Sequence, residues 1–103
     1  MFCHYAMFTL REGPDRAANA VKLKNWLERL GKEIELLRSV HIDLNSFAGP
    51  DAADMLMMAT YASVDDLANV RADPRHQEML AWYRQVAIDS DRREVNFLAE
   101  RKT

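Results

Sequence analysis

Residues 2–10 read FCHYAMFTL, a run of aromatic and apolar side chains without proline or glycine. Such a run is typical of a β-strand, in which successive side chains point to opposite faces of a sheet. Both faces of this strand are largely apolar, and the same holds for residues 54–62, DMLMMATYA. We therefore expect both strands to need cover on both sides of the sheet.

The segments around these two strands predict helices and further strands. Apolar side chains recur at steps of three and four over residues 15–30, which predicts a helix that Gly31 ends. Residues 39–47 alternate apolar and polar side chains, as in a strand with one face in water. Helix starts are predicted at Ser63 and at Asp73-Pro74, and the last strand covers residues 94–99.

The predicted order is strand, helix, strand, strand, helix pair, strand, which is the α+β ferredoxin-like arrangement. In this arrangement the helices cover only one face of an antiparallel sheet. Because two of the strands are apolar on both faces, the other face would be a large bare apolar surface, which monomers rarely expose. We therefore expect residues 1–103 to form a single domain that pairs with a second copy of itself through this face, as a dimeric α+β barrel.

Composition excludes several classes of protein. Hydrophobic residues make up 49% of the 103 residues and charged residues 29%, as in an ordinary globular domain. The net charge of −2 provides no basic face for nucleic acid, and no apolar stretch approaches the roughly 20 residues of a membrane span. Cys3 is the single cysteine, so no internal disulfide is possible. With no signal-peptide pattern at the start, we expect a cytoplasmic protein without nucleic-acid or membrane partners.

Two histidines are candidates for chemistry. His76 falls on the first turn of a predicted helix, and a histidine with a pKa near ~6.5 can take or give a proton at neutral pH. The structural alternative is a ring that only hydrogen-bonds a backbone group. His4 shares the face of Phe2 and Phe8, so its ring needs a polar partner, either in a pocket or within the core.

Aromatic side chains are candidates for the wall of a ligand pocket. Trp26, Tyr61 and Tyr83 are the predicted members, whereas Trp82 is expected in the core. The hydroxyl of Tyr61 would either donate to an oxyanion or point to solvent. No metal-binding motif is present, so we expect neither a metal nor a cofactor.

Several short segments, taken in order, resemble the stress-responsive A/B-barrel (Dabb) family over nearly the whole chain. These segments are His4 before an apolar run ending in Leu10-Arg11-Glu12-Gly13, Asp54 at the start of a strand, Ser63-Val64-Asp65-Asp66-Leu67, Asp73-Pro74-Arg75-His76-Gln77-Glu78, and Glu94-Val95-Asn96-Phe97. The resemblance implies a dimeric α+β barrel. It implies little about activity, because most members have no assigned reaction.

One plant branch of the family, olivetolic acid cyclase, closes a linear polyketide by aldol condensation without metal or cofactor. The resemblance implies that His76 matches the base of that branch and that His4 matches a histidine of its pocket. The chain departs from the branch at Val70, where the cyclase has a tyrosine, and at Asp73, where the motif begins with histidine.

Two functions follow as expectations. The first is a homodimer that binds a small apolar or aromatic ligand near His76, with no assigned reaction; the departures at Val70 and Asp73 favour it. The second is a cofactor-independent enzyme of the cyclase, isomerase or monooxygenase type with His76 as general base. The retained His4 and His76 favour this alternative.

Overall fold

The chain forms an antiparallel sheet with helices packed against one side. The computed structural model describes residues 1–99. The elements are β1 (Phe2–Phe8), α1 (Arg16–Glu33), β2 (Ser39–Leu44), β3 (Met55–Tyr61), α2 (Val64–Ala72), α3 (Pro74–Val86), a short 3-10 turn (Asp89–Asp91) and β4 (Arg93–Leu98).

The strands lie in the order β2-β3-β1-β4, and every neighbouring pair is antiparallel. The first strand in the sequence is therefore central, with His4 opposite Ala59 of β3 on one side and opposite Asn96 of β4 on the other. This order and the helices on one side confirm the predicted ferredoxin-like α+β fold.

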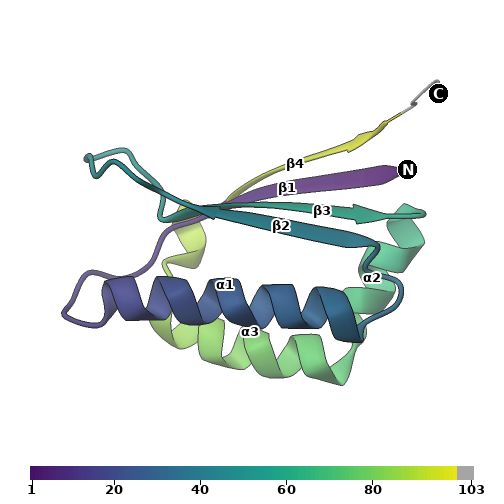
Figure 1. The fold of residues 1–103 in the computed structure, drawn as a ribbon, viewed down its shortest axis with the longest axis horizontal. Helices are drawn as coiled ribbons and strands as arrows, with labels where there is room; N and C mark the ends of the chain where they lie inside the picture. Colours follow the sequence, from purple (N-terminus) through teal and green to yellow (C-terminus); the bar gives the residue numbers. More distant parts are fainter. Residues whose placement is uncertain (100–103) are drawn as a thin grey trace.

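The hydrophobic core lies between the sheet and the helices, which all lie on the same side of the sheet (Figure 1). The apolar stripe of α1 faces the sheet, as its spacing predicts, and Leu23 and Leu30 from it are almost completely buried. Leu10 and Val70 join them among the most buried large side chains. Within residues 1–99, no helix combines the length and the apolar character that crossing a bilayer requires.

None of the helices described in residues 1–99 lies over the opposite face of the sheet, which we call the open face. On β1, β3 and β4 it is mainly apolar, from Cys3, Tyr5, Met7, Leu56, Met58, Val95 and Phe97, with Thr60 and Arg93 as polar members at its ends. On β2 it is polar, from Ser39, His41 and Asp43. Tyr5 and Phe97 pack with their ring centroids 5.5 Å apart, and Val95 is 63% exposed. The predicted bare apolar surface is therefore present on three of the strands.

Three local predictions need correction. The strand predicted over residues 39–47 ends at Leu44. The first strand ends at Phe8, because the N–H of Leu10 turns to the carboxylate of Asp54, at 2.6 Å, and leaves the ladder. The first helix continues past Gly31 to Glu33. Gly31 serves packing and not helix termination: a β-carbon there would lie 3.1 Å from Cγ2 of Val40 on β2.

Candidate functional site

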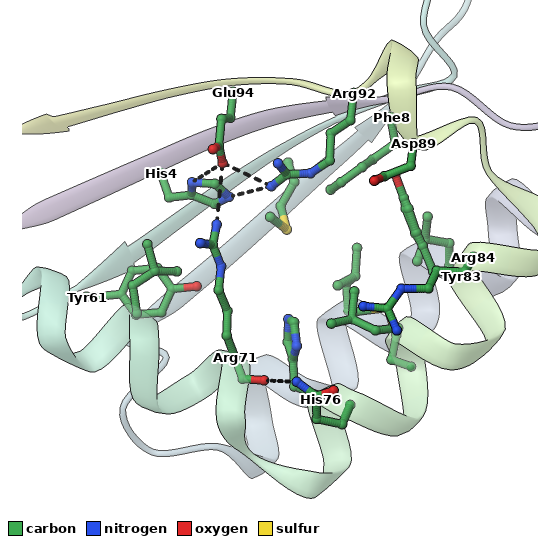
Figure 2. A pocket seen from close by; sticks show the side chains of 17 residues that line it. His4, Phe8, Tyr61, Arg71, His76, Tyr83, Arg84, Asp89, Arg92 and Glu94 are labelled. Atoms are coloured by element: carbon green, nitrogen blue, oxygen red, sulfur yellow. Dashed lines mark hydrogen bonds and ion pairs between the residues drawn. The ribbon is translucent and has the colours of Figure 1, made fainter.

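A cavity of about 380 Å³ opens between the helix-covered face of the sheet and the helices α2 and α3. Figure 2 shows that His4 and Glu94 enter it from the sheet, whereas Arg71 and His76 enter it from the helices. Its floor and sides are apolar, from Phe8, Leu23, Leu27, Met57, Leu67, Met79 and Leu80. A cavity of this size suits a small organic ligand.

Four of the residues predicted for the site line this cavity together. They are His4, Tyr61, His76 and Tyr83. The fifth, Trp26, lies elsewhere: its ring stacks on Trp82 of α3 with the centroids 5.6 Å apart. It flanks the apolar stripe of α1, and the ammonium of Lys22 approaches both indole rings from solvent, so the pair joins the two helices outside the cavity.

His76 is positioned by the start of α3. The carboxylate of Asp73 caps this helix by accepting from the N–H of Arg75 at 2.8 Å, and Pro74 occupies the first turn, as the sequence predicts. The Nδ1 atom of His76 is buried without a hydrogen-bond partner among the described residues. Burial, reinforced by the charges of Arg71 and Arg92 and opposed by that of Asp73, lowers the pKa of His76. The ring is therefore neutral at pH 7.

His4 is held in one orientation by Asn96 of β4 and by Arg92 just before this strand. Its Nδ1 lies 2.5 Å from Oδ1 of Asn96, and its Nε2 lies 3.3 Å from Nη2 of Arg92. Because arginine can only donate, Nε2 must be the acceptor, and Nδ1 must carry the proton that it donates to Asn96. Burial is the largest effect on His4 and lowers its pKa, so this neutral tautomer persists at pH 7.

The two tyrosines of the cavity are hydrogen-bond donors and not bases. Burial raises the pKa of Tyr61 to about 12, and burial together with the charge of Asp89 raises the pKa of Tyr83 to about 12. Tyr61 is only 4% exposed, which excludes the solvent-facing alternative. The hydroxyl of Tyr83 is buried without a partner among residues 1–99.

The cavity wall also contains charged residues that the sequence analysis did not predict. Arg71, Arg92 and Glu94 form a cluster in which Oε2 of Glu94 lies 3.4 Å from Nη2 of Arg71 and 3.1 Å from Nη2 of Arg92. Although burial raises the pKa of Glu94, the neighbouring cations lower it overall, so its carboxylate is ionised. Arg84 and Asp89 line the cavity as well. Nothing in the local sequence marks these residues: the pairing of β4 with β1 brings Glu94 beside His4, and Arg71 reaches Glu94 from α2.

The arrangement offers acid–base and anion-binding chemistry. A neutral histidine with an unpaired nitrogen can accept a proton, tyrosine hydroxyls can donate to a developing oxyanion, and arginines stabilise negative charge. Among the residues that the structure describes, no group of three or more His, Cys, Asp or Glu side chains is arranged to hold a metal ion.

Comparison with solved structures gives the same fold at low sequence identity. A dimeric protein of unknown function and ferredoxin-like fold from Bacteroides fragilis is 18% identical, with a TM-score of 0.80 and 93% of each chain covered. A dimeric ferredoxin-like protein of unknown function from Thermobifida fusca is 20% identical, with a TM-score of 0.73 over 95% of this chain and 90% of that one. SnoaB, a cofactor-independent oxygenase from Streptomyces nogalater, is 12% identical, with a TM-score of 0.69 over 98% and 94%.

Sequence comparison identifies the family. No functionally curated protein matches the chain. The sequence profile of the stress responsive A/B barrel domain, however, matches residues 2–97, nearly the whole chain. This chain therefore belongs to the stress responsive A/B barrel (Dabb) family, as its ordered motifs predict.

Proposed function

We propose that this protein is a homodimer whose subunits each bind a small apolar or aromatic ligand in the cavity beside His76. One observation carries this proposal: two buried polar atoms, Nδ1 of His76 and the hydroxyl of Tyr83, have no hydrogen-bond partner within residues 1–99 and belong to residues that line the same cavity. Buried polar groups are ordinarily hydrogen-bonded, and an unpaired one costs about 1–3 kcal/mol. A ligand with polar groups that face these two atoms would satisfy them.

The open face supports the homodimer. Exposed apolar side chains such as Val95 and Phe97 continue across β4, β1 and β3, and a second copy packed there would cover them with two-fold symmetry. The similar proteins from Bacteroides fragilis and Thermobifida fusca are both described as dimeric. We also propose a cytoplasmic location without nucleic-acid or membrane partners, as the composition predicts.

The second candidate is a cofactor-independent enzyme with His76 as general base. The lowered pKa of His76 favours it, because a neutral ring can remove a proton from a carbon next to a carbonyl. The proton would move to the imidazole, and the resulting enolate oxygen would accept hydrogen bonds from Tyr83 or a neighbouring arginine. The oxygenase from Streptomyces nogalater, which has this fold, is described as cofactor-independent.

A block of the cavity tests ligand binding. Leu80 is half-buried in the cavity wall, so Leu80→Trp fills the space, whereas Leu36→Trp makes the same change on an exposed turn. We expect ketone and aromatic probes to raise the melting temperature of the wild type and of Leu36→Trp but not of Leu80→Trp. Equal stabilisation of all three proteins would place the ligand elsewhere, and no stabilisation of the wild type would reject the proposed function.

Proton exchange separates binding from catalysis. If His76 acts as a base, a bound ketone in D₂O should lose its α-proton NMR signal faster with wild-type protein than with His76→Gln. The control is His41→Gln, which alters an exposed histidine on the open face. Exchange at the same rate with wild type and His76→Gln, with binding retained, would leave the protein as a binder only.

A further inference from the structure

The wall of the cavity is positively charged although the chain is not. Three arginines line it, Arg71, Arg84 and Arg92, against only two carboxylates, Asp89 and Glu94. Both histidines of the wall are neutral at pH 7, so the wall carries one net positive charge in a chain whose net charge is −2. A cation excess in the wall of a cavity favours a negatively charged occupant.

The arginines beside His4 keep free hydrogen-bonding capacity. Within residues 1–99, the polar side-chain contacts of Arg71 and Arg92 all use the single atom Nη2 of each guanidinium, directed to Glu94 and, for Arg92, also to His4. A guanidinium has five N–H donors arranged as a planar fork. The Nε and Nη1 donors of both residues therefore remain for a ligand, and two arginines side by side suit the two oxygens of a carboxylate.

The apolar lining of the cavity indicates that the rest of that ligand is apolar. The guanidinium of Arg92 lies 5.6 Å from the ring centroid of Phe8, so the charged end of the cavity adjoins its apolar side. Beyond Phe8, the lining is aliphatic and thioether, from Leu23, Leu27, Leu67, Met57 and Met79. An ion without an apolar part would leave this surface in contact with water, and a purely apolar molecule would leave Arg71 and Arg92 to share the one carboxylate of Glu94.

We infer that the ligand of this cavity is an amphipathic organic anion, with a carboxylate held by Arg71 and Arg92 and an apolar or aromatic body packed against Phe8 and the aliphatic lining. This inference rests on the proposed ligand-binding function and specifies its chemical class. The unpaired hydroxyl of Tyr83 supplies a further donor to an oxygen of the same ligand.

Matched acids and amides test the inference. Naphthoic acid with naphthamide, and octanoic acid with octanamide, differ within each pair only in the charged group. We expect calorimetric titration at about pH 7 to show each acid binding about tenfold or more tightly than its amide, because hydrogen bonds to charged groups are stronger. Raising the salt concentration should reduce this preference.

Arginine variants locate the charge. Arg71→Gln should remove most of the acid preference while amide binding stays, since the side chain of Arg71 is 46% exposed and its loss leaves the core intact. Arg84→Gln should reduce the preference less, because we assign the carboxylate to the other two arginines. Arg38→Gln makes the same change of net charge on the exposed segment before β2, outside the cavity. This variant should keep the preference for the acid over the amide unchanged.

The outcomes separate the two proposals. Equal affinities for acid and amide in the wild type would overturn the anion inference and leave an apolar site. Equal losses in Arg71→Gln and Arg38→Gln would overturn it too, because the preference would then reflect net charge alone. Failure of both members of both pairs to bind the wild type would reject the inference together with the proposed ligand-binding function.

Discussion

The two buried histidines should make the stability of the fold depend on pH in the weakly acidic range. Burial lowers the pKa of both His4 and His76 below the ordinary value of 6.5. In the unfolded chain both rings would titrate near ~6.5. As the pH falls through this value the unfolded chain takes up protons that the folded protein does not, so the free energy of unfolding decreases.

The magnitude follows from the number of protons involved. One proton bound by the unfolded state alone changes the free energy of unfolding by about 1.4 kcal/mol per pH unit, so the two histidines together give a slope of up to about 2.8 kcal/mol per pH unit. The loss continues until the pH reaches the lowered pKa values of the folded protein. The total stability of a domain of this size is about 5–15 kcal/mol, so the effect is large.

Urea unfolding followed by the fluorescence of Trp26 and Trp82 measures this slope between about pH 7 and about pH 5. Protein concentration stays constant, because dimer stability depends on it. His76→Gln should remove about half of the slope, because one of the two buried rings is then absent. A wild-type slope near zero, or the same slope in His76→Gln, would refute the account of neutral buried rings.

Three other substitutions test the fold and its assembly. Asp54→Ala removes the acceptor of the buried N–H of Leu10 and the ion-pair partner of Arg16. Urea unfolding should therefore show that the free energy of unfolding falls by about 3 kcal/mol, and a decrease below about 1 kcal/mol would contradict this. Val95→Glu on the open face should convert the dimer to monomer in light scattering, whereas Val64→Glu on exposed α2 should not. Gly31→Ala should destabilise the wild-type protein, because the side chain of Val40 blocks the new β-carbon. In a Val40→Ala background, where this side chain is shortened, the same Gly31→Ala change should stabilise the protein by up to about 1 kcal/mol.

Much of the fold could be predicted because its determinants are local. Side-chain alternation marks the strands, and the capping residues mark the helix starts: Ser63 accepts from the N–H of Asp66 at 3.3 Å, and Asp73 caps the next helix. Gly31 misled the prediction, because a glycine required by the close approach of Val40 looks in sequence like a helix terminus.

The candidate site could be predicted only in part. His4 and His76 belong to one cavity, but the residues alone gave no reason to place them together; the family resemblance did. The charged wall could not be predicted, because Arg71 and Glu94 meet only when α2 packs against the sheet and β4 pairs with β1 in the observed register. Trp26 was placed in the wall because its aromatic ring suits a ligand pocket, yet its position beside the apolar stripe of α1 turns it outward to Trp82.

Four charged members of the cavity wall lie where the protein tolerates change. Arg71, Arg84, Asp89 and Glu94 are all exposed residues at the outer edge of the cavity, whereas the frame beneath them depends on deeply buried leucines. Replacing an exposed residue ordinarily alters stability by less than about 0.5 kcal/mol, whereas truncating a buried leucine costs about 2–5 kcal/mol. Evolution can therefore exchange the charges of this wall, and with them the molecules it selects, without rebuilding the domain that carries it.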